Sequence, residues 1–283
     1  MLTTNLYSSQ IFGQPTRGKT ARNRLRRVDN FILMYDSHLL RKRCGAFREA
    51  MFVDLGFGAE PFTTLESAER LRRVNPDLRV LGVEVDPGRV AAARPHANRN
   101  TDFRVGGFNL PLETGESVRA IRAFNVLRQY EEGEVREAHG LMSSYLLPGG
   151  ILMEGTSDPF GRVWTANLLR KGKKAEAEAA MSYEALIFST NFRLGFESGM
   201  FQPVLPKNYI HRMVPGEMIY EFIGAWKQAT RLTMAYKSLG LRQWFIANAC
   251  SLARAGYSID LRRRFLRRGY LIWKLNKVKD QTA

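Results

Sequence analysis

Short apolar runs alternate with longer amphipathic stretches through the first half of this chain. Five apolar runs predict strands, at residues 51–55, 80–85, 102–105, 119–126 and 151–156. Helical patterns lie between several of them, most clearly at 63–71 and 132–146, where Pro148, Gly149 and Gly150 provide a stop and a turn before the fifth strand. Strands that alternate with helices predict a parallel sheet covered by helices, which is an α/β fold.

The flanking regions show other patterns. Residues 1–20 carry no clear period, whereas 21–43 fit a helix with apolar positions at three- and four-residue steps. Two more strands are expected at 163–169 and 183–190, joined by a hydrophilic turn at 171–174, and helices are expected at 216–240 and 241–268. We therefore predict a basic arm and helix at 1–49, a core at 50–195, and a cap with a basic helical extension at 196–283.

A glycine turn follows the first strand directly. Gly56 and Gly58 allow a sharp turn and a close approach of a ligand to the backbone, and the helix behind them offers free N–H groups. Glu84 ends the second strand, 26 positions after Gly58. One carboxylate at that place can accept hydrogen bonds from both hydroxyls of a ribose. This pairing predicts a nucleotide-type site, although the crossover is somewhat longer than usual.

Several motifs in one order resemble those of the class I S-adenosylmethionine-dependent methyltransferases. They are VDLGFG, GVEVDP, FNLP, AFNVLRQY and LLPGGILME, and they extend roughly from Met51 to Asp158. FGAEPFTT and the upstream Arg24–Arg27 run also resemble uncharacterised bacterial members. The resemblance implies a Rossmann-like seven-strand sheet with an antiparallel edge, an N-terminal helix and a helical C-terminal extension. It also implies S-adenosylmethionine as cofactor and methyl transfer as the reaction.

The same resemblance implies a set of cofactor-binding residues. Glu84 would accept from the ribose, or would be a solvated strand end. Asp54 would orient the ammonium end of the cofactor, or would be a structural cap. Phe108 would stack on adenine or belong to the core, and Asn109 would offer its amide to the base or hold a turn. The full set is Asp54, Gly56, Phe57, Gly58, Glu84, Val85, Phe108, Asn109 and Asn125.

Candidates for the methyl-acceptor side follow the fourth strand. Asn125, Arg128 and Tyr130 lie in a segment that departs from the [DN]PP[YF] pattern of amino-methylating DNA enzymes, which disfavours those targets. Arg128 could hold an anionic substrate or pair with Glu131. His211 is a candidate general base or a structural residue. Glu154, Ser157 and Asp158 could line the same mouth, and the other histidines, including His139, look incidental.

Positive charge is concentrated at the two ends of the chain. The net charge is +16, of which residues 1–50 and 254–283 carry +7 each. Such ends attract nucleic acid, anionic lipid or acidic substrates, or they only solvate the surface. Three functions therefore stay open. The chain could methylate RNA or an RNA-bound protein, methylate a small molecule, or serve as a non-catalytic RNA-binding or scaffold protein.

Remaining patterns limit the other classes. Residues 13–20 match the P-loop pattern GxxxxGK[ST], but no buried strand precedes them. Residues 261–275 combine arginines with apolar side chains, which could dock on an anionic membrane. We expect no transmembrane segment and no secretory signal. We also expect no metal site, because Cys44 and Cys250 do not have the spacing of metal ligands. A cytoplasmic protein with reduced thiols is the expectation.

Overall fold

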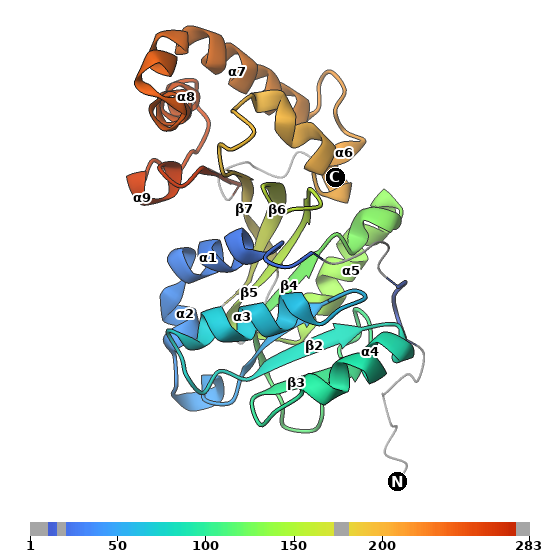
Figure 1. The fold of residues 1–283 in the computed structure, drawn as a ribbon. Helices are drawn as coiled ribbons and strands as arrows, with labels where there is room; N and C mark the ends of the chain where they lie inside the picture. Colours follow the sequence, from blue (N-terminus) through green and yellow to red (C-terminus); the bar gives the residue numbers. More distant parts are fainter. Residues whose placement is uncertain (1–10, 16–20, 173–180, 276–283) are drawn as a thin grey trace.

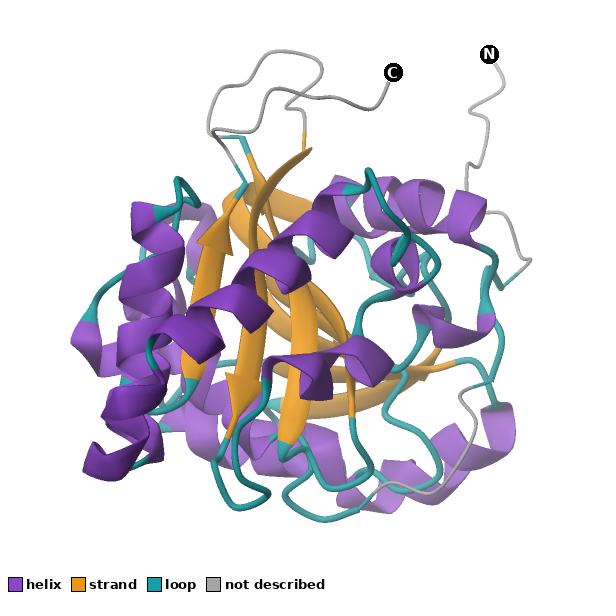
Figure 2. Ribbon diagram, turned by 90° about the horizontal axis from the view of Figure 1, so that it is seen from above, coloured by secondary structure: helices purple, strands orange, loops and turns teal. Residues whose placement is uncertain are grey.

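The computed structural model describes residues 11–15, 21–172 and 181–275. Within them, eight strands form one sheet in the order β3-β2-β1-β4-β5-β6-β7-β8, with helices on both faces (Figures 1 and 2). The strands are β1 (Met51–Leu55), β2 (Val80–Glu84), β3 (Thr101–Val105), β4 (Val118–Phe124), β5 (Leu146–Ser157), β6 (Val163–Lys171), β7 (Met181–Thr190) and β8 (Tyr270–Lys274).

The first five strands confirm the predicted α/β core. β2 pairs with β1 and β3, and β4 pairs with β1 and β5, all in parallel. The crossover helices are α3 (Phe62–Arg72), α4 (Pro87–Ala93) and α5 (Glu132–Ser144). Asp86 caps α4 by accepting from the N–H groups of Gly88 and Arg89, and Pro87 occupies the first helical position. The strand order 3-2-1-4-5 is that of a Rossmann-like sheet.

An antiparallel edge completes the sheet. β6 pairs with β5 and β7, as expected, but β8 adds an eighth strand that the sequence analysis did not predict. The helix expected at 241–268 is shorter in the structure: it is α8 (Leu241–Arg254), and it ends there because Gly256 turns the chain at φ +96°. Gly269, at φ +75°, packs so closely on the Thr190 carbonyl that a side chain there would collide with it. The chain thus re-enters the sheet instead of continuing as a helix.

Burial of the apolar side chains in 261–275 makes the membrane-docking prediction wrong. Phe265, Leu266 and Trp273 are at most 2% exposed. Trp273 stacks on Phe222 at 4.0 Å between ring centroids, inside the protein. These side chains are committed to the core and are not available to lipid.

Several element boundaries also differ from expectation. β5 begins at Leu146, so the Pro148–Gly150 segment lies within the strand as a bulge rather than before it, with Val118 opposite Leu146 and Ala120 opposite Ile151. The helix expected at 21–43 is two helices, α1 (Arg26–Tyr35) and α2 (Ser37–Arg41), because Asp36 accepts from the Leu39 N–H and caps a new start. The helix expected at 216–240 is α7 (Met218–Leu232) followed by a 3-10 helix, η5 (Met234–Leu239).

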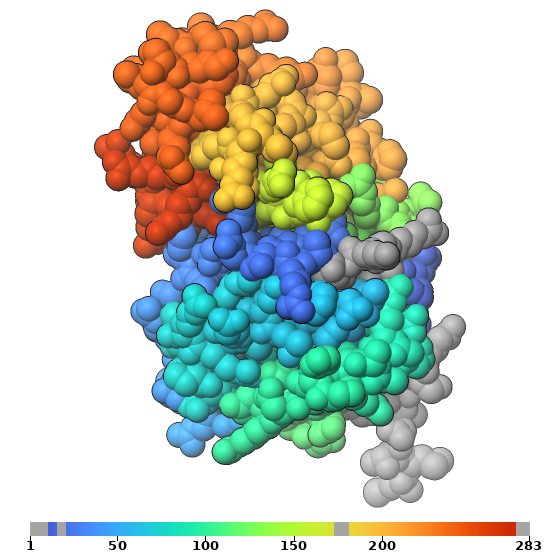
Figure 3. Space-filling model, viewed as in Figure 1, coloured from blue at the N-terminus to red at the C-terminus, as the bar shows by residue number. Residues whose placement is uncertain are grey.

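A helical lobe lies beyond one end of the sheet, and Figure 3 shows it as a distinct mass. It contains η4 (Ser198–Val204), α6 (Lys207–Ile210), α7, η5, α8 and α9 (Arg263–Leu266). Its core is aromatic: Phe201 and Trp226 stack at 5.0 Å, and Phe188 of β7 packs on both. The lobe is thereby fixed to the antiparallel edge. The division at residues 49 and 195 stays a prediction, and part of the predicted 171–174 turn lies outside the described residues.

None of the helices in the described ranges is long and apolar enough to cross a membrane.

Candidate functional site

The glycine turn and the acid of the second strand meet at the carboxyl ends of β1 and β2. Gly56 and Gly58 have φ values of +73° and +87°, which other residues adopt only with strain. The Gly58 N–H donates to Glu84 Oε2 at 2.9 Å, and the Val85 N–H donates to Oε1 at 3.0 Å. Glu84 is 1% exposed. The turn therefore fixes the orientation of this carboxylate, which is the acid predicted to contact a ribose.

Asp54 lies below the turn in a buried polar network. One of its oxygens accepts from the hydroxyls of Thr63 and Thr64, at 2.7 and 2.8 Å. The other pairs with Arg122 at 2.7 Å. Arg122, which is 0% exposed, also contacts Asp29 on α1. Both oxygens of Asp54 thus have protein partners that tie β1 to α3 and, through Arg122, to α1.

Two phenylalanines that were predicted to bind the cofactor, Phe57 and Phe108, have buried side chains. The Phe57 ring packs edge-on against Phe103 at 5.5 Å and is 1% exposed. Phe108 packs on Tyr130 at 5.1 Å and is 4% exposed. Burial of the phenol raises the pKa of Tyr130. Because both rings are buried, contact of either ring with a ligand would need rearrangement.

An N-terminal strap, residues 11–15, crosses this end of the sheet. The Phe12 carbonyl accepts from the Phe108 N–H at 2.7 Å, and the Phe12 N–H donates to Asn109 Oδ1 at 2.8 Å. The Gln14 N–H donates to the Tyr130 hydroxyl.

Gly13 lies at the centre of the strap's contacts. A side chain added there would stand within 4 Å of Val85, Gly107 and Tyr130. The strap therefore gathers the predicted nucleoside-binding residues around itself. Residues 16–20 of the P-loop-like pattern lie outside the described part of the chain.

A candidate mouth for the methyl acceptor consists of residues that follow β4, end β5 and precede α1. Asn125, in the left-handed conformation at φ +61°, exchanges hydrogen bonds with Ser157, at 3.2 Å from its Nδ2 and 3.0 Å to its Oδ1. Arg24 Nε donates to Ser157 Oγ at 3.1 Å, and its burial lowers the pKa of the guanidinium. Arg24 was not singled out as a site residue, although it lies in the Arg24–Arg27 run. Asn125, Ser157 and Arg24 form one polar surface.

Among the other acceptor-side candidates, Asp158 also lies on this surface, because its carbonyl accepts from Arg24 Nε at 3.2 Å, whereas Arg128, His211 and Glu154 do not converge on it. Arg128 is exposed and donates to the Pro203 carbonyl of η4 at 3.1 Å, so it links the mouth to the lobe. His211 is exposed at the end of α6. Its neighbour Arg212 donates to Glu132 of α5 at 2.6 Å. Glu154 is 1% exposed and lies inside the sheet rather than at the mouth.

A buried cluster around His139 is the feature that the sequence analysis missed. His139 Nε2 lies 3.3 Å from Glu154 Oε2, and Nδ1 lies 2.9 Å from the Tyr183 hydroxyl. Burial, with the Glu154 carboxylate second, raises the pKa of Tyr183 to about 12. The phenol therefore keeps its proton and can donate to Nδ1, which puts the ring proton on Nε2, facing Glu154. These residues are far apart in sequence, and no local spacing marks them.

Comparisons with known proteins give structural likeness alone. No protein-family model matches the sequence, and no curated protein matches it. Similar solved structures include the methyltransferase domain of a citrinin polyketide synthase, at 19% identity and a TM-score of 0.33. Others are magnesium protoporphyrin IX methyltransferase from Synechocystis PCC 6803, at 16% and 0.35, and an amino pentose methyltransferase from Micromonospora echinaspora, at 19% and 0.34.

The alignments cover 40%, 47% and 61% of this chain and 30%, 54% and 69% of those chains, respectively. The chain thus spans about a third and about half of the first two proteins. These neighbours are methyltransferases of the class that the motifs resemble, but likeness at this level carries no argument about activity. The Rossmann-like fold is established by the strand order and directions described above.

Proposed function

We propose that the chain is an S-adenosylmethionine-dependent methyltransferase whose cofactor lies across the carboxyl ends of β1 and β2. The observation that carries this proposal is the contact between the Gly58 N–H and Glu84, at 2.9 Å. It joins two motifs that were predicted separately to hold the same ligand. Glu84 Oε2 also lies 3.8 Å from Arg89 Nη1, and we propose that ribose hydroxyls donate to the carboxylate beside these contacts.

The residues at this edge fit the nucleoside half of the cofactor. Val85 offers an apolar edge and Asn109 an amide for the base, and Gly56 and Gly58, which lack side chains, allow a close approach to the backbone of the turn. Asp54 fits a direct role less well, because internal donors occupy both of its oxygens. We propose that Asp54 positions the turn from below and contacts the cofactor at most through water.

When bound, S-adenosylmethionine would supply an electrophilic methyl group. The protein's part is then to align the acceptor and exclude water, which accounts for most of the acceleration in such in-line transfers. We assign alignment to Asn125 at the mouth and to the Tyr130 hydroxyl beneath the strap, and closure to Arg128 through its contact with the lobe. His211 would act as general base only for an acceptor that is protonated at the working pH.

The strap favours a second function. Its hydrogen bonds to Phe108, Asn109 and Tyr130 occupy the edge where the adenine is proposed to lie. A chain in which the strap never leaves would bind no cofactor and would be a non-catalytic RNA-binding or scaffold protein.

Isothermal titration calorimetry with S-adenosylmethionine separates the two functions. We expect binding by the wild-type chain and a loss of at least about tenfold in affinity, about 1.4 kcal/mol, in Glu84→Ala. Glu69→Ala is the matched control, because Glu69 is an exposed carboxylate of α3 whose ion pair within the described residues is with Arg73. Circular dichroism would verify that both variants fold.

A chain that lacks residues 1–15 completes the test. If neither this chain nor the full-length protein gives heat with S-adenosylmethionine, the methyltransferase proposal is wrong and the non-catalytic function stands. If binding occurs, the acceptor is sought by mass spectrometry of cellular RNA and metabolites, as a mass shift of one methyl group that depends on the protein.

A further inference from the structure

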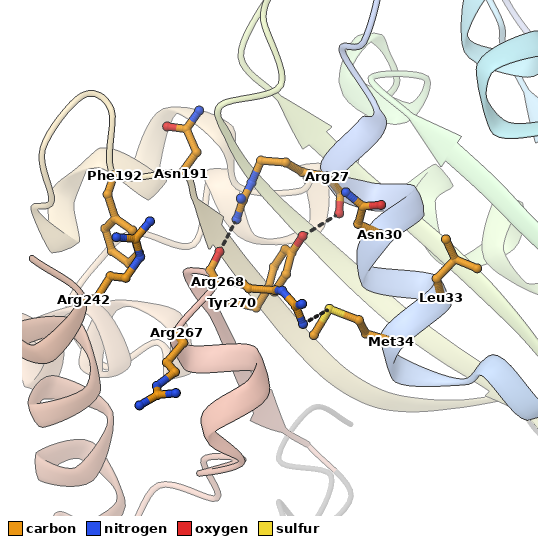
Figure 4. Close-up of a pocket in the computed structure, with 10 residues that line it drawn as sticks. All are labelled: Arg27, Asn30, Leu33, Met34, Asn191, Phe192, Arg242, Arg267, Arg268 and Tyr270. Atoms are coloured by element: carbon orange, nitrogen blue, oxygen red, sulfur yellow. Dashed lines mark hydrogen bonds between the residues drawn. The ribbon is translucent and has the colours of Figure 1, made fainter. Parts of the chain in front are cut away.

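An arginine cleft opens between the sheet and the helical lobe, away from the glycine turn. Its volume is about 450 Å³, within the range of ligand sites. We define it by four arginines and two aromatic residues: Arg27, Arg242, Arg267, Arg268, Phe192 and Tyr270. They come from α1, α8, the turn after α9, the loop after β7, and the start of β8, and Figure 4 shows them around one space.

The cleft is cationic without local compensation. None of its described lining residues is acidic, and none of the four arginines has a carboxylate within 4.0 Å among the residues that the structure describes. Arg27 instead donates to neutral oxygens, the Thr190 carbonyl at 2.8 Å and the Arg268 carbonyl at 2.7 Å. Its burial lowers the pKa of the guanidinium. Clustered cations that lack a protein anion attract an anionic ligand from solution.

Aromatic rings stand beside these cations. The Arg27 guanidinium lies 4.7 Å from the centre of the Tyr270 ring, and that of Arg242 lies 5.9 Å from the Phe192 ring. Phe192 has φ +62°, an outlier for a bulky residue, and is held by its edge-on contact with Phe245. Strain of this kind is concentrated at ligand sites. The combination of arginine and aromatic faces suits a phosphate that is attached to an organic group.

The arginine cleft shares residues with a second hollow of about 540 Å³, which contains Asn191, Phe192 and Arg242 and adds Arg193. Arg24, three positions before Arg27 in the chain, precedes α1 and contacts Ser157 at the mouth. Arginines therefore occur at the proposed methyl-transfer mouth, in the cleft and in the second hollow.

We propose that the arginine cleft binds the phosphate groups of a phosphate ester and anchors a phosphate-bearing methyl acceptor whose reactive end reaches the mouth. The role as anchor for the acceptor rests on the proposed function, whereas phosphate binding does not. Arginine forks suit phosphate oxygens because they donate two parallel hydrogen bonds. The ester is supplied by a single-stranded nucleic acid or by a small phosphorylated molecule, and both use the same contacts.

Fluorescence anisotropy with a labelled single-stranded RNA of about 12 nucleotides, and calorimetry with inorganic pyrophosphate, test this proposal without cofactor. The test variant is Arg242→Ala/Arg267→Ala, because both side chains are exposed and carry no fold contacts to a carboxylate. The matched control is Arg94→Ala/Arg99→Ala, which removes the same charge from exposed positions beyond α4. Comparison of the two variants separates a local site from the effect of net charge.

We expect at least about tenfold weaker binding in the cleft variant and less than about twofold in the control. For RNA, the slope of log K against log salt should fall by about 1.4, since each lost phosphate contact of a single strand contributes about 0.7. If the cleft variant loses affinity for RNA only, the phosphate ester comes from nucleic acid. If the protein binds no RNA and the cleft variant loses affinity for pyrophosphate, the phosphate ester is a small molecule. Equal losses in both variants, or no binding of either probe, would overturn the proposal. Phosphate binding that persists in a chain unable to bind S-adenosylmethionine would keep the cleft and remove its role as an acceptor anchor.

Discussion

Arginines lie against the sheet in two regions of the molecule, with opposite surroundings. In the parallel half, Arg122 is fully buried between Asp54 and Asp29. In the antiparallel half, Arg27 and the other arginines of the cleft face a cavity without a carboxylate partner among the described residues. The comparison teaches that partners, rather than residue type, decide the role of a cation. A guanidinium paired with buried carboxylates holds the fold, whereas exposed ones at a cavity, such as Arg242 and Arg267, are available to a ligand.

Electrostatics supports this distinction. Burial by itself would lower the pKa of Arg122. The neighbouring carboxylates of Asp54 and then Asp29 raise this pKa, and together they outweigh burial, so the pKa is raised overall. For Arg27, burial prevails and the pKa is lowered. The first cation is stabilised by the folded chain, and the second gains stabilisation if an anion arrives.

The largest expected effect is on the stability of the parallel half. Arg122→Ala leaves the buried Asp54 without its cation and leaves Asp29 with its pair to Arg70, which should lower the free energy of unfolding by about 3–5 kcal/mol. Arg242→Ala, at an exposed position of the cleft, should change it by less than about 0.5 kcal/mol. Urea unfolding measures both. Equal costs in the two variants would end the distinction between the two regions.

Gly58→Ala should have the next largest effect. At φ +87°, alanine is strained by about 1–2 kcal/mol, and the Gly58 N–H would turn away from Glu84. In Gly58→Ala, both the stability of the chain and its affinity for S-adenosylmethionine should therefore be lower than in the wild type.

Gly133→Ala is the control for this change. Gly133 lies in α5 with nothing within 4 Å of the added Cβ, so alanine should stabilise the chain by about 0.5–1 kcal/mol. Thermal unfolding and calorimetry compare the two changes. A Gly58→Ala chain as stable and as well liganded as the control would show that the turn needs no glycine there.

Removal of residues 1–15 should act mainly on rates. The strap's described hydrogen bonds to Phe108 and Asn109 must break before a base reaches the edge. Since each bond is worth about 0.5–1.5 kcal/mol, cofactor association should accelerate on the order of tenfold. Stopped-flow fluorescence measures this rate. Unchanged association would mean that the strap does not cover the entry path, whereas RNA binding at the cleft should be unaffected in either case.

The smallest effect concerns a paired carboxylate at the base of the parallel half. Burial raises the pKa of Glu116, but its hydrogen bonds, first with Arg104, lower it to about 2. A depressed carboxyl pKa means that this stabilisation is present above about pH 4.5 and is lost as the pH falls towards 2. The melting temperature of Glu116→Gln should therefore fall less than that of the wild type as the pH is lowered from about 4.5 towards 2. The exposed Glu69→Gln should follow wild type, and identical curves for all three would contradict the pairing.

The sequence allowed prediction of the parallel half because its signals are local. Apolar runs, the Gly56–Gly58 turn and the Asp86–Pro87 cap each occupy a few adjacent residues, and the structure confirms the strands and the cap. Glu84 was found beside the turn because parallel neighbouring strands end at one edge. These features depend on short-range periodicity and on a general rule of sheet topology.

The antiparallel half was harder because its signals are long-range. β8 is a short segment after an arginine-rich stretch, and it becomes a strand through pairing with β7, some 80 positions earlier. The arginine cleft joins Arg27 to Arg268, which are 241 positions apart. The His139–Glu154–Tyr183 cluster similarly depends on the packing of α5 against β5 and β7. Tertiary contacts, not local propensity, create each of these features.

The most direct test of the central claim is a crystal structure of the chain with S-adenosylhomocysteine. The account predicts electron density across the Gly56–Gly58 turn, with Glu84 within hydrogen-bond distance of the ribose hydroxyls and the base beside Val85. Density for the ligand elsewhere, or a strap that stays on Gly107 and Asn109 in saturating ligand with no density at the turn, would contradict it.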